Sequence, residues 1–209
     1  MSSIPIYLVV GFIGSGKTSL LRRLVHATED RNFIFVINEV SAVDIDSAQI
    51  EKEGGAAVAF VGGSVFSRRQ MPGFVSFMEK ISGGVLFGGE HLRPDAVIIE
   101  TSAMTDPCAA DRALKESGLD HNYHIAGITA VVDPGVLMLL LLLLLPDIKR
   151  QIQCADLILF NKTDLRSTEL INRVTERVRS LNCKAPVLHC TYCDVDAGFV
   201  LEFLPFSMK

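Results

Sequence analysis

The stretch Val9-Val10-Gly11-Phe12-Ile13-Gly14-Ser15-Gly16-Lys17-Thr18-Ser19-Leu20 decides the fold of this chain. It matches the pattern G-x-x-x-x-G-K-[ST], in which small residues let backbone N–H groups close around a phosphate. The apolar run 6–10 predicts a strand before the loop, and the spacing of leucines after Thr18 predicts a helix behind it. This strand–loop–helix context distinguishes a phosphate-binding loop from a glycine-rich turn with a structural lysine.

The same stretch predicts which residues hold the phosphates of a nucleotide. Backbone N–H groups and the positive end of the following helix dipole would face the anion. The Lys17 ammonium would bind the β- and γ-phosphates, and the Thr18 hydroxyl would hold Mg²⁺. The expected nucleotide contacts here are Gly14, Ser15, Gly16, Lys17, Thr18 and Ser19.

Length and composition predict one globular domain over residues 1–209, because 49% hydrophobic residues can bury one substantial core. A net charge of −4 without a long basic run argues against nucleic acid as a partner. The N-terminus lacks the basic region of a signal peptide. The five cysteines are an odd number, so we expect reduced thiols and a cytoplasmic location.

The most hydrophobic segment is 136–145, with seven consecutive leucines from Leu139. It is too short to span a bilayer, so we expect no membrane insertion. The segment predicts a buried helix or a leucine-rich turn. The alternative is a hydrophobic face for a partner or a homodimer, because a helix that is apolar on all sides needs cover.

Acidic residues follow two of the predicted strands. The buried apolar run 95–100 ends in Glu100, and the carboxyl ends of such parallel strands carry the ligand chemistry of open α/β sheets. Glu100 is therefore a candidate Mg²⁺ ligand, directly or through water. The acidic segment after the strand 33–37 adds Glu39 and Asp46 as candidates, with a solvated acidic turn as the alternative.

A second motif, Asn161-Lys162-Thr163-Asp164, directly follows the apolar strand 157–160. The Asp164 carboxylate can accept hydrogen bonds from guanine N1–H and from its exocyclic amine, a donor pair that adenine does not present. Hydrogen bonds to a charged group contribute roughly 1.5–3 kcal/mol each. Asn161 would connect this segment to the phosphate loop, and the Lys162 stem would lie over the base. The predicted nucleotide is therefore GTP or GDP.

The segment Cys190-Thr191-Tyr192-Cys193 follows a short closing strand and could contact guanine O6 through its backbone. Together with His189 and Cys183 it allows a metal-binding interpretation. A second Cys pair at the required spacing is absent from the sequence, which weakens that interpretation.

Taken together, these motifs resemble the CobW family of P-loop GTPases, relatives of the nickel-chaperone GTPases of urease and hydrogenase maturation. The resemblance implies an α/β fold of the SIMIBI type, with a mostly parallel sheet and helices on both faces. It also implies Mg²⁺-dependent GTP hydrolysis coupled to delivery of zinc or a cobalt corrinoid to a client protein. It rests on Gly11 to Thr18, Asn38-Glu39 with Asp46, Ile99-Glu100-Thr101-Ser102 with Asp106-Pro107, Val131-Val132-Asp133, Gln151 with Ala155-Asp156, and Asn161 to Asp164.

The chain departs from the family pattern at three places. Family members carry Cys-x-Cys-Cys after the third strand, where this chain has Ser64-Val65-Phe66-Ser67, and hydroxyls are poor ligands for zinc or cobalt. Ser41 and Ala103 replace the usual switch glycines. We also expect the family's second, C-terminal domain to be absent from the 209 residues.

Two functional hypotheses follow. The first is a slow GTPase switch that assists assembly of a metalloprotein or corrinoid protein, with Lys17, Thr18 and Glu100 as catalytic residues. The second is a guanine-nucleotide-binding interaction module that does not hydrolyse GTP and docks a partner through the leucine-rich segment. A phosphate-loop kinase is a third, weaker alternative, because the motif 161–164 has no place in its mechanism.

Overall fold

In the computed structural model, most of the chain forms parallel strands and the helices that connect them. The structure describes residues 3–27, 31–39, 50–52, 56–84, 93–103, 105–143, 145–196 and 199–200. The strands are β1 (Ile4–Val10), β2 (Phe33–Glu39), β3 (Ala56–Val61), β4 (Ala96–Glu100), β5 (Tyr123–Val132), β6 (Leu157–Phe160) and β7 (Val187–His189). The helices are α1 (Lys17–Ala27), α3 (Met71–Ser82), α4 (Ala110–Ser117), α5 (Pro134–Leu142), α6 (Pro146–Cys154) and α7 (Thr168–Leu181), with 3₁₀ turns η2 (Pro107–Ala109), η3 (Leu119–His121) and η4 (Thr163–Leu165).

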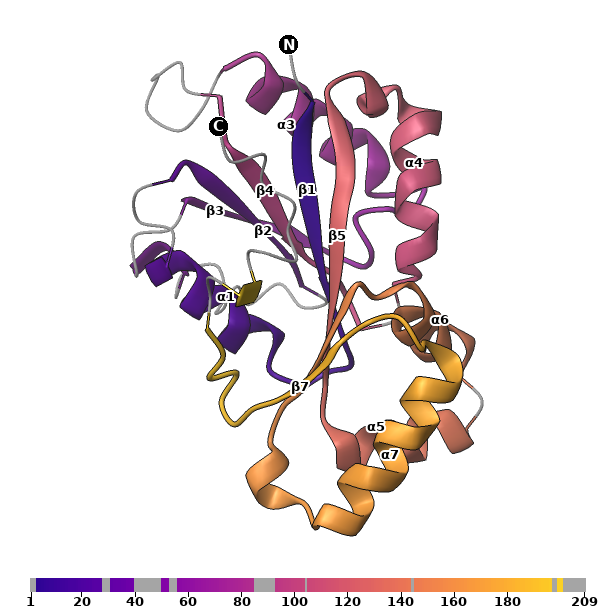
Figure 1. Cartoon of the computed structure of the whole chain (residues 1–209). Helices are drawn as coiled ribbons and strands as arrows, with labels where there is room; N and C mark the ends of the chain where they lie inside the picture. The colour runs from indigo at the N-terminus through magenta and orange to yellow at the C-terminus, as the bar shows by residue number, and fades with distance from the viewer. Residues whose placement is uncertain are drawn as a thin grey trace.

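The seven strands form one sheet in the order β3-β2-β4-β1-β5-β6-β7, and every neighbouring pair is parallel (Figure 1). The carboxyl ends of all strands therefore meet at one edge. Val9 of β1 lies opposite Glu100 of β4, and the Thr101 N–H donates to the Val9 carbonyl at 3.0 Å. This register places the end of β4 directly beside the phosphate loop that follows β1.

Each face of the sheet carries its own hydrophobic core, because side chains alternate along β1. Tyr7 and Val9 pack with the apolar face of α1. Ile6 and Leu8 pack on the opposite face with apolar side chains of the remaining helices. The predicted α/β fold with helices on both faces is confirmed.

The leucine-rich segment forms α5, and its apolar residues divide between core and surface. Leu137, Leu140 and Leu141 are buried, whereas Leu139 and Leu142 are exposed to 57% and 72%. Asp133 caps the helix, because its carboxylate accepts the Gly135 N–H at 2.9 Å. Within the described ranges, every helix is too short or too polar to cross a bilayer.

The cysteines correct one expectation. We expected reduced thiols, but the structure joins Cys108 of η2 to Cys154 of α6 in a disulfide, with their Cα atoms 6.1 Å apart. The two residues are separated by 46 positions in the chain and meet because α6 packs against η2. Cysteine spacing alone does not reveal such a pairing. Cys183, Cys190 and Cys193 remain free thiols.

Candidate functional site

The phosphate loop joins β1 to α1 and depends on glycine at two positions. Gly11 has φ +149°, and a Cβ there would lie 2.2 Å from the Val131 carbonyl oxygen. Gly16 has φ +111°, and a Cβ there would lie 2.2 Å from the Asn161 amide nitrogen. Any larger residue would push the loop away from the neighbouring strands β5 and β6. The loop is closed by the Ser15 N–H, which donates to the Phe12 carbonyl at 3.1 Å.

The structure brings together the three residues predicted to be catalytic. The Thr18 hydroxyl lies 3.3 and 3.2 Å from the two carboxylate oxygens of Glu100 and donates to them. The Lys17 ammonium forms an ion pair with Glu100 at 3.7 Å. Lys17 and Glu100 are both buried, so this charge pair is poorly screened by solvent. A hydroxyl, a carboxylate and an ammonium therefore converge at the start of α1.

The other predicted metal ligands are not located. Asp46 lies outside the described residues, as does Ser41 at the switch position. Glu39 ends β2, which pairs with β4, but its side chain is also outside the described part of the structure. Glu39 and Asp46 therefore remain predictions.

The predicted base-recognition motif is attached to the phosphate loop by two side chains. The Asn161 amide donates to the Ser15 carbonyl at 2.8 Å, which agrees with its predicted connecting role. The Lys162 ammonium donates to the Gly14 carbonyl at 2.6 Å. Asp164 is exposed, and one of its oxygens accepts the Thr191 hydroxyl at 3.0 Å. The Thr191 hydroxyl therefore holds the Asp164 carboxylate through one oxygen, a contact that the sequence analysis did not predict.

The closing segment 190–193 packs behind the same motif. The Cys193 N–H donates to the Asn161 side-chain oxygen at 2.9 Å, and its thiol lies 3.2 Å from the Gly16 carbonyl. A hydrogen bond with Cys190, together with burial, raises the pKa of the Cys193 thiol well above its ordinary value. This favours the protonated thiol, which is not a metal ligand. Among the described residues, no group of three His, Cys, Asp or Glu side chains is arranged to hold a metal ion.

A buried asparagine organises the loop that replaces the family's thiol motif. Asn38 donates to the Phe60 carbonyl at 3.2 Å and to the Gly63 carbonyl. Its side-chain oxygen accepts the N–H groups of Val65 and Ser102 at 3.1 and 3.3 Å. Asn38 therefore links the loop after β3 to the segment after Glu100. The sequence signal was a polar residue at the end of an apolar strand, but its partners depend on the sheet order.

The two serines of that loop stabilise its turns. The Ser64 hydroxyl accepts the Phe66 N–H at 3.3 Å, and the Ser67 hydroxyl accepts the Gln70 N–H at 3.4 Å. The Val65 side chain between them is completely buried. The loop geometry thus gives the hydroxyls a structural role.

Asp133 forms a charge cluster next to the phosphate loop that the sequence analysis missed. Arg166 donates to both Asp133 oxygens, at 3.1 and 2.9 Å, and the Lys162 ammonium lies 3.8 Å away. Burial raises the pKa of Asp133. The hydrogen bonds from Arg166 and Gly135 and the nearby positive charges outweigh that effect, so the pKa lies below its ordinary 3.8. The ion pair therefore fixes the start of α5 against the segment after β6.

We expect Arg166→Met to lower the free energy of unfolding by about 2 kcal/mol at pH 7, because a buried carboxylate loses its hydrogen-bond donors. A carboxylate with a lowered pKa stabilises the folded state above its unfolded pKa, and this contribution is lost as pH falls through the folded pKa. The difference between wild type and variant should therefore shrink below about pH 4. Urea unfolding at pH 7 and pH 3.5 measures it.

Arg173→Met is the matched control, because Arg173 is an exposed arginine on α7, the helix that follows Arg166. It should change the unfolding free energy by less than about 0.5 kcal/mol. Equal effects of both substitutions at pH 7 would contradict a stabilising Arg166–Asp133 pair.

The fold and the site define a nucleotide-binding domain with the P-loop GTPase fold of the SIMIBI type. A family model described as the CobW/HypB/UreG nucleotide-binding domain matches residues 5–189. The chain therefore belongs to the CobW/HypB/UreG family, as the motifs indicated.

Two curated relatives illustrate the similarity. The zinc-regulated GTPase metalloprotein activator 1 of Schizosaccharomyces pombe is 28% identical over 203 residues, which cover 94% of this chain and 48% of the relative. The zinc chaperone YjiA of Escherichia coli is 24% identical over 213 residues, which cover all of this chain and 64% of the relative. The chain thus spans about half to two thirds of the length of these proteins.

Solved structures show the same fold. The Zn(II)-bound YjiA GTPase from E. coli superposes with a TM-score of 0.69 at 22% identity, over all of this chain and 64% of that chain. HypB from Helicobacter pylori in complex with nickel gives a TM-score of 0.66 at 18% identity, over 99% of this chain and 92% of that chain.

Proposed function

We propose that this chain binds GTP and GDP with Mg²⁺ and hydrolyses GTP slowly, as a conformational switch in the delivery of a metal or metal cofactor to a client protein. The observation that supports this most is the meeting of Lys17, Thr18 and Glu100 at the phosphate loop. The link from Asn161 to the same loop supports guanine recognition by Asp164.

The residues present fit a magnesium ion. Mg²⁺ prefers oxygen ligands, and the Thr18 hydroxyl and the Glu100 carboxylate are oxygen donors in contact with each other. These two residues would hold the ion, directly or through water, and the bound ion would neutralise charge on the phosphates. Lys17 would bind the transferred phosphoryl group, while its buried ion pair with Glu100 keeps the ammonium in position.

We infer slow turnover because three side chains of the described part of the chain that could position a water molecule or a phosphate have other partners. The Gln151 amide donates to the carbonyls of Ala103 and Thr105. Arg166 is paired with Asp133, and Arg150 with Asp106. Unassisted switch GTPases turn over on the order of 10⁻⁴ to 10⁻² s⁻¹, so a partner would be needed to accelerate the reaction.

The proposed cargo is zinc, cobalt or a corrinoid, and the partner is a client metalloprotein or corrinoid protein in the cytoplasm. The naming of the relatives as zinc chaperones and a metalloprotein activator supports this class of cargo. The hydroxyls of Ser64 and Ser67 do not fit a thiolate metal site at the loop after β3. To deliver a metal, this chain would therefore need ligands outside that loop. A second copy of the chain in a homodimer is one way to supply them.

The first test compares nucleotides by titration calorimetry in the presence of Mg²⁺. GDP and GTP should bind about a hundredfold more tightly than ADP and ATP, because the Asp164 carboxylate has two donors to pair with only in guanine. Equal affinity for ATP and GTP would contradict the proposal. Metal analysis of the purified protein and turnover with Zn²⁺ or Co²⁺ then identify the cargo class.

A second candidate is an interaction module that binds guanine nucleotides without hydrolysing them. The exposed Leu139, Leu142 and Leu143 at the end of α5 favour it, because they offer an apolar surface to a partner. Multiple-turnover GTPase activity that is lost in Lys17→Ala but kept in Lys184→Ala, an exposed lysine after α7, would exclude this candidate. Tight GDP binding without any turnover would favour it.

A further inference from the structure

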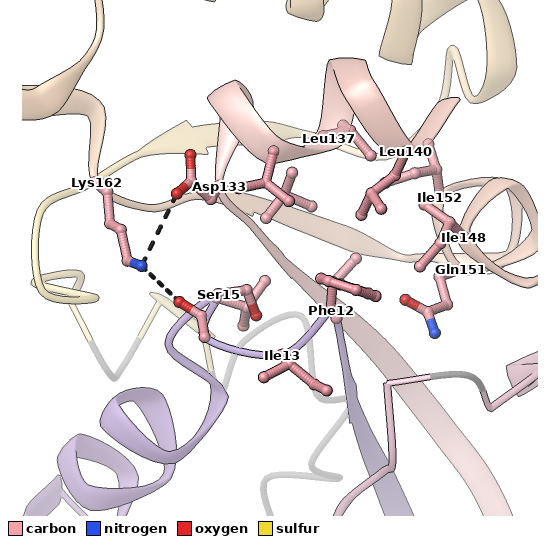
Figure 2. Close-up of a pocket in the computed structure, with 16 residues that line it drawn as sticks. Phe12, Ile13, Ser15, Asp133, Leu137, Leu140, Ile148, Gln151, Ile152 and Lys162 are labelled. Atoms are coloured by element: carbon pink, nitrogen blue, oxygen red, sulfur yellow. Dashed lines mark hydrogen bonds and ion pairs between the residues drawn. The ribbon is translucent and has the colours of Figure 1, made fainter. Parts of the chain in front are cut away.

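A cavity of about 110 Å³ lies beside the phosphate loop, on the face of the sheet opposite α1 (Figure 2). Its walls are mainly apolar side chains from the loop, α5 and α6, namely Phe12, Val136, Leu137, Leu140, Ile148 and Ile152. Lys17, Thr18, Glu100 and Asp164 do not line it. The cavity therefore borders the predicted nucleotide site, with which it shares Gly14, Ser15 and Lys162, but it does not include the residues predicted to bind magnesium or the carboxylate predicted to pair with the base.

The amide oxygen of the buried residue Gln151 faces this cavity and has no hydrogen-bond partner among the described residues. Gln151 is only 2% exposed, and its NH₂ group donates to the carbonyls of Ala103 and Thr105 at 2.9 and 3.1 Å. These two bonds fix the orientation of the amide, so its oxygen must point the other way. Figure 2 shows it pointing toward Phe12. Within the described part of the chain, this oxygen accepts no hydrogen bond.

A second unpaired polar atom lies at the loop side of the cavity. Ser15 lines the cavity and is 3% exposed, and its hydroxyl has no hydrogen-bond partner among the described residues. Leaving buried polar atoms unpaired is unfavourable, so a ligand that pairs with them gains more than its apolar contacts alone provide. The buried Ser15 hydroxyl and the unpaired Gln151 oxygen at the wall of one small cavity point to a ligand with a polar group.

The charged residues at the cavity rim indicate that this ligand is neutral. Asp133 and Lys162 both line the cavity. However, Asp133 is paired with Arg166 and Lys162, and the Lys162 ammonium also donates to the Gly14 carbonyl. Each of these charged side chains already has a partner within the protein, so a ligand needs no charge of its own to pair with them.

We propose that this cavity is a binding site for a small neutral molecule with an apolar body and one hydroxyl or N–H group, which donates to the Gln151 amide oxygen. An apolar cavity of about 150 Å³ can hold benzene, so the body is limited to roughly one six-membered ring. The ligand would contact the phosphate loop directly and the segment 103–105 through Gln151. Its occupancy is therefore coupled to nucleotide affinity.

The test uses phenol and benzene as probes, with methyl groups of leucine and isoleucine observed by NMR and no nucleotide present. Phenol should give saturable shifts at Leu137, Leu140, Ile148 and Ile152, and should bind roughly three- to tenfold more tightly than benzene because of its hydrogen bond. The absence of saturable shifts, as for a cavity that holds only water, would overturn the proposal. Benzene binding as tightly as phenol would overturn the role of Gln151.

Two substitutions on the same helix provide the matched comparison. Leu140→Phe fills the cavity and should weaken phenol binding at least about tenfold. Leu139→Phe adds the same ring at an exposed position outside the cavity and should change the affinity less than about twofold. Equal effects would place the phenol elsewhere. If Leu140→Phe does not fold, Val136→Leu at the half-buried rim is the milder filling variant and should weaken binding in the same direction.

The coupling is tested by the affinity for GDP with and without saturating phenol. A change of at least about twofold in either direction is expected. An unchanged affinity would overturn the coupling. This last measurement rests on the proposed nucleotide binding, whereas the NMR titration does not, so the two can fail separately.

Discussion

Asp164→Asn should lower the affinity for GDP by about two orders of magnitude and make xanthosine diphosphate the preferred ligand. The aspartate carboxylate accepts from two donors of guanine. An asparagine amide can accept only through its oxygen, and its NH₂ group faces the exocyclic amine of guanine. Xanthine carries an oxygen in place of that amine, so it restores the pairing with asparagine. Titration calorimetry with both diphosphates measures the exchange.

The structure indicates that this substitution leaves the site otherwise intact. Asp164 is exposed, and the Thr191 hydroxyl that donates to it can donate equally to an asparagine oxygen. Asp194→Asn is the matched control, because it removes the same charge from a nearby exposed carboxylate that is paired with Arg23 at 2.8 Å. The control should keep its preference for GDP. A preference for GDP that survives in Asp164→Asn would mean that Asp164 does not contact the base.

Gly16→Ala should abolish measurable nucleotide binding and lower the free energy of unfolding by roughly 2–4 kcal/mol. The new Cβ would lie 2.2 Å from the Asn161 amide nitrogen and 3.1 Å from the Cys193 sulfur, at a φ of +111° that alanine rarely adopts. To relieve this contact, the loop must move away from Asn161, which connects it to the base-recognition motif. Urea unfolding and GDP titration measure the two effects.

Gly14→Ala is the control for the contribution of backbone strain. Gly14 also has a positive φ, of +73°, but a Cβ there meets no atom within 4 Å. It should lower stability by about 1 kcal/mol and leave GDP binding detectable. If both alanine variants behaved alike, the contact between Gly16 and Asn161 would not be the reason for the glycine.

The strands and the two nucleotide motifs were predictable because each is a contiguous run of residues. Apolar stretches such as 95–100 and 157–160 became β4 and β6, and the leucines spaced after Thr18 became the buried face of α1. A continuous apolar run also indicates burial on both faces, which parallel strands need. These features depend on residues that are close together in the chain, so they can be predicted from the sequence alone.

Other features depended on how distant segments pack. The seven leucines suggested a helix apolar on all sides, but only the packing of α5 decides that Leu140 is buried while Leu139 is exposed. The disulfide between Cys108 and Cys154 was not expected, because cysteine spacing does not show which helices meet. The role of Asn38 likewise required the pairing of β2 with β3 and β4.

The sequence by itself determined that this chain has a phosphate loop, an Asn-Lys-x-Asp motif and the strands that carry them, because short-range spacing encodes each of these. Only the tertiary structure decided that Glu100 meets Lys17 and Thr18, that Asn161 holds the loop, and that Gln151 faces a cavity beside it. Those contacts join residues that lie far apart in the chain. The order of the parallel strands brings their ends together, and no local pattern specifies that order.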